Sequence, residues 1–441
     1  MSDIQLETAL SRPGNFRFGE VSSATAPAAR GSSVPGLGPL AAFTGTFRGS
    51  GFNLIFRPDS AKTPTALPIP VSGSDNVLEL NLTREALSFS AMLGSVPNRG
   101  SGTQGDVFLN GVPYLQTISD VTVPGQPVGI HVEPGLWMVV PGTADPAEGA
   151  TVVRMASVPH GTTVQAQGTS TRVTGKPTIP ALDITPFSTA PPHTKTPFPS
   201  QTAATHAAAR IPQNLDSFVA AGTITQAMLN DPNTFLRNHI ASQTITSATV
   251  ISISSHPAMP LFGGGADNIA FLLGDTTASA PNAQTRRMEA TFWVETAQFS
   301  VEVPVFEPGQ PPLIIPANTG AAGQPVPEFR VSPPVPITAP RTITVKATQI
   351  QYSQQVFLNF STLTWPHVSV ATLVPASPIP VPASAFRPRP APHQPRGQGG
   401  TSDNSARSRG ATDCPAEETT PAPRDFDYLP LDQAGIRIYR L

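Results

Sequence analysis

The sequence predicts a mainly β protein: an antiparallel up-and-down β-barrel with a partly helical insertion and disordered termini. The first observation is the 52 prolines among 441 residues. Proline opposes long helices because it lacks the backbone N–H and clashes with the preceding turn. The second is that many segments alternate apolar and polar residues, as strands with one buried face do. Such strands, joined by short turns, close most naturally into a barrel, which removes exposed edges and encloses space for a ligand.

Residues 36–175 are expected to form the first part of the barrel. Their alternating segments are 43–57, 76–92, 106–123, 129–142 and 149–170. In the second of these, three leucines share one face of a strand, Leu78, Leu80 and Leu82. In the third, the dipeptide Asn110-Gly111 is a strong turn signal and predicts a hairpin.

Residues 176–285 are expected to be an insertion, because they contain the clear helical signal of the chain. Within 214–243 the apolar residues recur every three to four positions, with a break at Asp231-Pro232. Alternation returns in residues 286–375, which we expect to supply the closing strands of the barrel.

The two ends of the chain have a different composition. Residues 1–35 are small, polar and rich in Pro and Gly, and residues 376–441 are Pro-rich in the same way. Such segments bury too little apolar surface to offset the entropy lost on ordering. We therefore expect a flexible N-terminal segment and a disordered C-terminal tail, which is a candidate for recruiting a partner protein.

Charge and cysteine content argue against several classes of protein. The net charge is −2, without the basic patch of a nucleic-acid binder. The single cysteine, Cys414, cannot form a disulfide within the chain, so folding does not require an oxidising compartment. The N-terminus lacks a signal-peptide pattern, and no apolar run reaches the roughly 18 residues of a membrane helix. We therefore expect a cytoplasmic protein with neither a nucleic-acid nor a membrane partner.

Three segments carry a resemblance to a known family. The first is LGPLAAFTGTFRGSG at 37–51, with Phe47 at the usual place of a tryptophan. The second combines IHVEPGLWMVV with VVRMASVPHGTTVQAQGT, a His-x-Glu-x-Gly strand followed by a turn and a returning strand. The third, IQYSQQVFLNFSTLTWPHVSVATL, ends in a strand that begins at His367. In this order the segments resemble the nitrobindin family of haem-binding, calycin-like barrels.

This resemblance implies that the chain binds haem b inside the barrel with His367 as the iron ligand. Neutral imidazole is a good ligand for haem iron. The small or apolar residues Ser369, Ala371 and Leu373 share a face with His367 if the strand is regular, whereas a one-residue slip would turn the histidine away. The implied activities are binding of nitric oxide or another small molecule, and turnover of reactive nitrogen or oxygen species by a peroxynitrite isomerase or a weak peroxidase.

Other residues are candidates for the same pocket. His160, in a turn, is the candidate catalytic residue on the distal side of the haem, because imidazole transfers protons readily near neutral pH. Candidates for contacts with the cofactor are Arg48 and Arg154 for the propionates, Thr162 and Thr163 for hydrogen bonds, and Trp137 for the pocket wall. Each of these residue types also has an ordinary structural role in strands and turns.

Three alternatives stay open at the level of sequence. His131 and Glu133 lie two apart on one strand face, and with His160 they would form the two-histidine, one-carboxylate set of a non-haem iron enzyme. A metal-free barrel that carries a lipid or metabolite is the second alternative. The third is a scaffold that acts through its Pro-rich tail.

Overall fold

The computed structural model describes residues 34–386, except residues 63, 73–74, 146, 257–264, 269–281 and 319–323. The chain divides into two units, Met1–Arg387 and Pro388–Leu441, and all described residues belong to the first. Residues 1–33 of the expected N-terminal segment and residues 387–441 of the expected C-terminal tail, including Cys414, lie outside the described residues. The tail was expected to be disordered from residue 376, but residues 376–386 are ordered, because Phe386 packs into the core.

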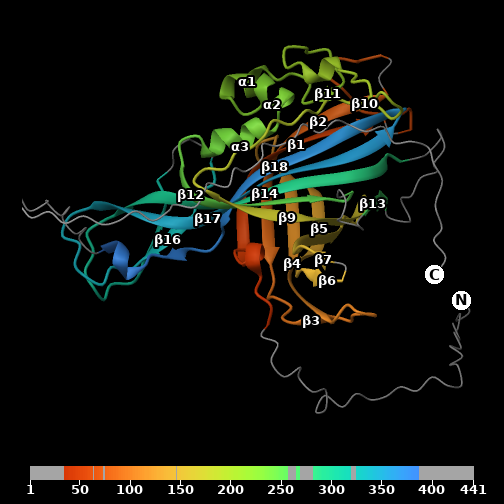
Figure 1. Cartoon of the computed structure of the whole chain (residues 1–441). Coiled ribbons are helices and arrows are strands. Elements are labelled where there is room, and N and C mark those ends of the chain that lie inside the picture. Colours follow the sequence, from red (N-terminus) through yellow and green to blue (C-terminus); the bar gives the residue numbers. More distant parts are fainter. Residues whose placement is uncertain are drawn as a thin grey trace, which may run out of the picture. The chain divides into compact units, whose positions relative to one another are not determined.

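Ten antiparallel strands form a closed barrel (Figure 1). Each strand pairs with the next barrel strand along the chain, and β1 pairs with β18 to close the ring. This is the predicted mainly β, up-and-down barrel, and it is consistent with a calycin-like fold. The barrel strands are β1 (Gly45–Pro58), β2 (Asn76–Phe89), β4 (Val107–Asp120), β5 (Val128–Val140), β8 (Thr151–Ser157), β9 (Thr162–Thr174), β12 (Thr244–Ser254), β14 (Gln284–Val303), β17 (Arg341–Phe360) and β18 (Leu363–Pro375).

Two local features differ from the sequence-based expectation. Asn110-Gly111 does not form a hairpin, because β4 runs straight through it. The Asn110 side chain is buried and donates to Pro35 O at 2.6 Å, while a Cβ at Gly111 would lie 2.4 Å from the carbonyl oxygen of Trp137. Tertiary contacts at these two residues therefore override the local turn preference. In addition, β12 is a barrel strand although it lies within the range expected as an insertion.

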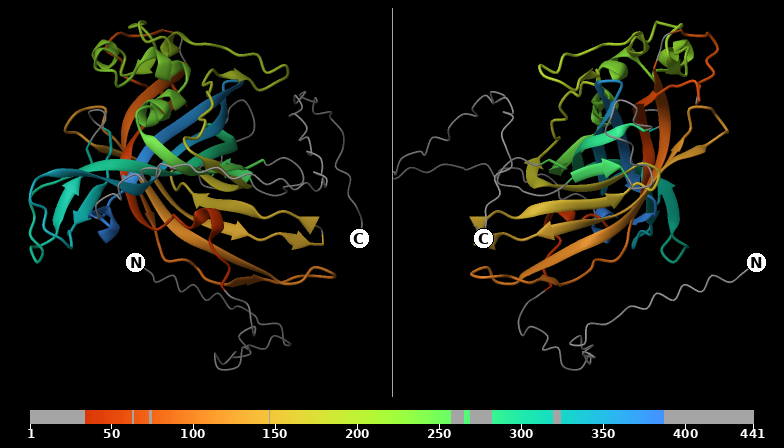
Figure 2. Two further views of the ribbon diagram at one scale, coloured as in Figure 1. Left: turned by 60° about the vertical axis from the view of Figure 1, so that its left-hand side comes forward. Right: turned by 90° about the vertical axis from the view of Figure 1, so that its right-hand side faces the viewer.

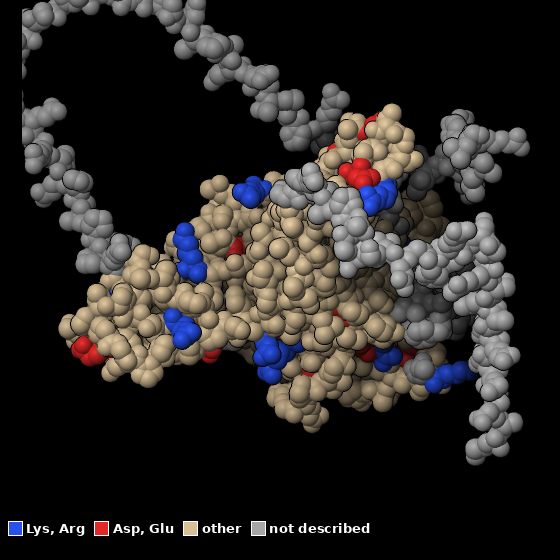
Figure 3. Space-filling view, turned by 90° about the horizontal axis from the view of Figure 1, so that it is seen from below, with Lys and Arg blue, Asp and Glu red and all other residues tan. Residues whose placement is uncertain are grey.

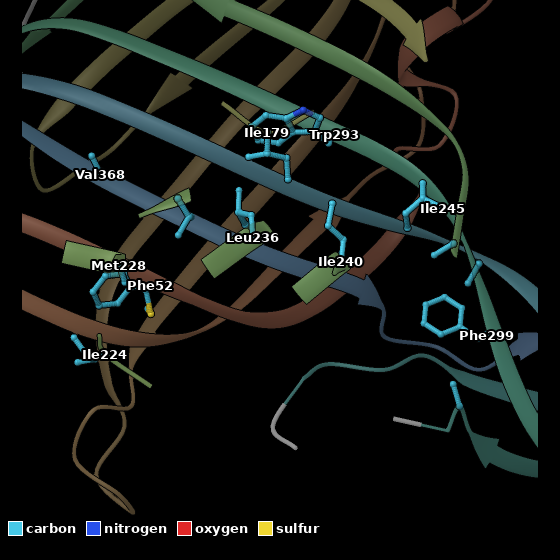
Figure 4. Packing of buried hydrophobic residues seen from close by; sticks show 14 of the residues in the cluster. Phe52, Ile179, Ile224, Met228, Leu236, Ile240, Ile245, Trp293, Phe299 and Val368 are labelled. Carbon is cyan, nitrogen blue, oxygen red and sulfur yellow. The ribbon is translucent and has the colours of Figure 1, made fainter. Parts of the chain in front are cut away.

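Three short helices cover part of the outer wall of the barrel. They are α1 (Asp216–Ala221), α2 (Gln226–Asn230) and α3 (Asn233–Ile240), and the chain breaks between α2 and α3 at Asp231-Pro232 as predicted. Apolar residues of this helical layer pack on β1, β2 and β18 (Figures 1 and 4). The predicted leucine face of β2 is real, but it points outward into this layer: Leu78 and Leu80 are buried there and Leu82 packs against it.

The long strands β14 and β17 continue beyond the barrel wall and carry a small lobe there (Figure 2). The lobe contains β15 (Leu313–Pro316), β16 (Glu328–Val331) and β19 (Ile379–Pro380), which form a three-stranded sheet, and the turn η4 (Ala383–Phe386). The remaining short elements are η1 (Gly38–Leu40), β3 (Val96–Asn98), β6 (Thr143–Ala144), β7 (Ala147–Glu148), β10 (Phe187–Ser188), η2 (Pro199–Gln201), β11 (Arg210–Ile211) and β13 (Gly265–Asn268).

Aromatic residues fill one part of the barrel interior. Phe43, just after η1, stacks on Phe89 with a ring-centroid distance of 4.6 Å and meets the edge of Trp137 at 5.5 Å. Trp137 contacts Phe292 at 5.0 Å, and Phe292 stacks on Tyr352 at 5.4 Å. Because these rings form a continuous interior core, they leave only the remaining part of the interior for a cavity.

The outer surface is polar but sparsely charged. On the face shown in Figure 3, Lys and Arg side chains are scattered among mostly uncharged residues, as the charged content of 13% predicts. Within the part of the chain that the structure describes, no helix has the length and apolar character needed to cross a membrane.

Candidate functional site

A cavity of about 390 Å³ occupies the barrel interior beside the aromatic core. Its volume is in the range of small-molecule pockets, roughly 300–1,000 Å³. Three histidines line it, His131, His160 and His367. Much of the remaining wall is apolar, with the side chains of Ile55, Ile118, Ile130, Val158, Val164, Met288, Val356 and Leu358. The strands thus bring together histidines that are far apart in the sequence.

His367 lies on the inner face of β18, which settles the question of its register. Val368 pairs with Leu54 of β1 and packs outward, whereas His367 lines the cavity and shares its face with Ser369, as predicted. Burial, together with the nearby charges of His131 and His160, lowers the pKa of His367 to about 3. The imidazole is therefore neutral throughout the physiological range.

Asn53 of β1 controls the hydrogen bonding of this imidazole. Its Nδ2 donates to Nε2 of His367 at 2.9 Å and to Oγ of Ser369 at 2.7 Å. Its Oδ1 accepts from Nδ2 of Asn81 on β2 at 3.3 Å. Because Nε2 accepts a hydrogen bond, the neutral ring of His367 carries its proton on Nδ1.

A buried ion pair lies in the cavity wall between β5 and β8. Glu133 and Arg154 are each about 2% exposed and form a salt bridge. The hydroxyl of Tyr114 donates to the same carboxylate oxygen of Glu133 and accepts from Nε of Arg154 at 2.8 Å. Nη1 of Arg154 donates to Gln354 Oε1 at 2.5 Å. Each of the three guanidinium nitrogens thus donates one hydrogen bond, and the group also lies over the ring of Phe292 at 5.4 Å.

These contacts keep Glu133 ionised although it is buried. Burial, the largest single effect, would raise the pKa of Glu133, but the charge of Arg154 and the contacts with His131 and Tyr114 together outweigh it. The pKa of Glu133 is lowered to about 2 as a result. The carboxylate is therefore a permanent negative charge beside the cavity, neutralised by Arg154.

His131 and His160 form a pair at the cavity wall. Nε2 of His131 donates to the second carboxylate oxygen of Glu133 at 3.2 Å. The ring of His160, in the turn between β8 and β9, meets the ring of His131 edge-on with centroids 5.2 Å apart. Burial, followed by the charge of His131, lowers the pKa of His160 below its ordinary value, so His160 is neutral at pH 7.

A second buried carboxyl group lies in the barrel interior, and the sequence reasoning missed it. Glu85 accepts hydrogen bonds from Tyr352 at 2.6 Å and Thr83 at 2.9 Å. Burial raises the pKa of Glu85, although these hydrogen bonds oppose the shift. A Cβ at Gly51 would lie 2.6 Å from the Glu85 carboxyl, so the glycine makes room for it. The sequence did carry a signal for this carboxyl group, because the polar residues of β2 alternate with its leucines and face inward.

The other predicted site residues are divided between the cavity and the remaining structure. Thr162 and Arg154 line the cavity. Trp137 faces inward but belongs to the aromatic core. Arg48 and Thr163 are exposed because they alternate with the inward residues Phe47 and Thr162, so neither of them lines the cavity. Arg154 reaches the cavity, but Glu133 already occupies its guanidinium.

The structure does not support the alternative metal site. Across the described residues, no three His, Cys, Asp or Glu side chains are arranged to hold a metal ion. Although His131, Glu133 and His160 do come together, Tyr114 and Arg154 occupy one oxygen of Glu133 and His131 occupies the other. A metal ion would have to displace these contacts inside the barrel.

No protein-family model, no curated protein and no solved structure matches this chain. The likeness to calycin-like barrels therefore rests on the ten-stranded fold itself.

Proposed function

We propose that the barrel binds haem b in its cavity, that His367 would hold the iron, and that the haem-bound protein takes up nitric oxide or turns over reactive nitrogen or oxygen species. The observation that carries the proposal is the neutral imidazole of His367 on a partly apolar cavity wall inside a barrel. When bound, haem would supply the iron chemistry, and the chain would supply the ligand and exclude water.

The residues present fit this group in two respects. His367 is neutral and protonated on Nδ1, so the lone pair of Nε2 is the one that would bind iron once the hydrogen bond from Asn53 is displaced. The apolar side chains of the cavity, such as Met288, Val356 and Leu358, suit the faces of a porphyrin. Arg154 is not free to bind the propionates, because its guanidinium is paired with Glu133.

The proposal predicts a Soret band that depends on His367. Protein supplied with haem is compared with the His367→Ala variant by absorption spectroscopy, and we expect the variant to lose the band or shift it strongly, because it lacks the ligand nitrogen. The matched control is His206→Ala, which removes an exposed histidine paired with Asp216 outside the cavity. Failure of the parent protein to develop a band on haem titration would overturn the proposal.

Asn53→Ala is expected to strengthen haem binding by about 2- to 10-fold. The variant removes the hydrogen bond to Nε2 of His367 that haem must displace, and such a bond contributes roughly 0.5–1.5 kcal/mol. Haem titration of both proteins measures the change. Asn81→Ala serves as the control because it contacts Asn53 but not His367. Weaker binding by Asn53→Ala would show instead that Asn53 supports the bound state.

The same hydrogen bond favours a second candidate function, metal-free binding of a small organic molecule. Because Asn53 donates to Nε2, the imidazole of His367 has a hydrogen-bond partner without any metal. The cavity also combines an apolar wall with a few polar groups, as many metabolite pockets do. Native mass spectrometry of the purified protein distinguishes the two functions. A bound organic mass without a Soret band would favour the metal-free carrier, and a haem adduct would exclude it.

A further inference from the structure

Glu133 and His131 form a hydrogen-bonded pair beside the cavity, and the haem proposal does not use it. Nε2 of His131 donates to Oε2 of Glu133. His131 makes no further hydrogen bond to any described residue, so Nδ1 is without a protein partner there. The His131 side chain is 18% exposed and lines the cavity. A neutral imidazole protonated on Nε2 has a lone pair on Nδ1.

The carboxylate of this pair is held rigidly from behind. Tyr114 and Arg154 both donate to Oε1 of Glu133, which leaves Oε2 for His131. The chain therefore contains a continuous series of contacts from the aromatic core, through Arg154 and Glu133, to an imidazole at the cavity. A carboxylate that fixes the tautomer of a histidine and stabilises the imidazolium is the device that makes histidine an effective base.

We propose that His131 is a general acid–base residue for small, largely apolar molecules bound in the cavity, and that Glu133 is its positioning residue. In the forward step, Nδ1 of His131 takes a proton from an acidic C–H or O–H group of the bound molecule. The resulting imidazolium is stabilised by Glu133, and it returns the proton to the product or to water. This step requires neither a metal nor a redox partner, so it can be tested on haem-free protein.

The test uses a probe that reports proton abstraction directly, 5-nitrobenzisoxazole. A base removes the proton from its C3, the C–H electron pair forms the nitrile, and the N–O bond breaks with its electron pair going to oxygen, so that the ring opens to a coloured cyanonitrophenolate. Haem-free protein is assayed at pH 7, beside free imidazole at equal concentration. We expect the protein to exceed free imidazole, and His131→Ala to lose about 100-fold or more of the protein's rate, the usual contribution of a positioned base.

Controls separate a chemical role from a structural one. His206→Ala, outside the cavity, should keep the rate of the parent protein, and circular dichroism should show that each variant is folded. Added imidazole should restore the rate of His131→Gly if the ring acts as a base. It should fail to do so in the triple variant His131→Gly/Glu133→Gln/Arg154→Met, because the carboxylate that would position the added imidazole is gone and Arg154 is not left as an unpaired charge.

Glu133→Gln alone leaves the buried Arg154 without a charged partner, so Glu133→Gln/Arg154→Met is the second variant for this position. We expect it to fold and to be slower than the parent protein. Three results would overturn the proposal. They are a parent rate no higher than that of free imidazole, an unchanged rate in His131→Ala, or a rate that is lost in His160→Ala but kept in His131→Ala. Because the assay contains no haem, absence of a Soret band would leave its outcome unaffected.

Discussion

Replacing Arg154 with methionine is expected to lower the free energy of unfolding by about 3–5 kcal/mol, the cost of leaving one member of a buried ion pair alone. Arg154 and Glu133 are each about 2% exposed, so water cannot solvate the remaining carboxylate. Methionine retains much of the side-chain volume among Tyr114, Trp137 and Phe292, so the effect reports charge more than packing. Urea unfolding followed by circular dichroism measures it.

The double variant Glu133→Gln/Arg154→Met provides the matched control for this prediction. It removes both charges, and we expect its stability to recover most of the loss, because a neutral pair needs no compensation for a buried charge. The pH dependence offers a further check. The pKa of Glu133 is lowered to about 2 in the folded protein, so its contribution to stability is present above its ordinary pKa and is lost as the pH falls toward 2. Equal losses in the single and double variants would contradict this account.

Replacing Glu295 with glutamine is expected to stabilise the protein at neutral pH. Glu295 is 1% exposed on the outer wall of β14, opposite Gln349 of β17, which donates to its Oε2 at 2.7 Å. Its Oε1 has no hydrogen-bond partner among the described residues. Burial raises the pKa of Glu295 to about 7, and Gln349 and the charge of Lys176 oppose the shift only in part. A neutral amide replaces a carboxyl that the fold already prefers to keep protonated.

The sign of this effect follows from the two states of the chain. Below the ordinary pKa of 4.5, Glu295 is protonated whether the protein is folded or unfolded. As the pH rises from 4.5 to about 7, the unfolded chain loses the proton while the folded chain keeps it, so stability falls. The glutamine variant lacks this loss. The free energy of unfolding of the variant should equal that of the parent protein near pH 4 and exceed it by on the order of 3 kcal/mol at pH 8.

The difference between Glu295→Gln and the parent protein isolates this carboxyl from its neighbours. His239 of α3 lies in the same layer, and burial lowers its pKa to about 4, so it destabilises the fold at acid pH in both proteins. Lys176, the charged neighbour, donates to the carbonyl oxygens of Ile240 and Ala241 at the end of α3. Thermal unfolding at pH 4, 6 and 8 measures the difference. A difference that stays constant with pH would refute a titrating Glu295.

The sequence by itself determined the strand architecture and the break in the helical segment. Alternation with period two arises from the backbone of each strand, so the shared face of Ser369 and His367 could be predicted locally. The break at Asp231-Pro232 was equally local, because proline limits the helix on its N-terminal side. These features depend on neighbours in the chain and need no knowledge of the fold.

Only the tertiary structure decided which face of each strand lines the cavity. The helical layer buries the outer face of β1 and β2, so the leucines at 78 and 80 are as buried outside the barrel as Phe47 is inside it. Alternation distinguishes the two faces of a strand, but it cannot say which face encloses the cavity when both are covered. The pairing of Glu133 with Arg154 likewise depends on the alignment of β5 with β8, and strand register is a long-range property that local sequence does not encode.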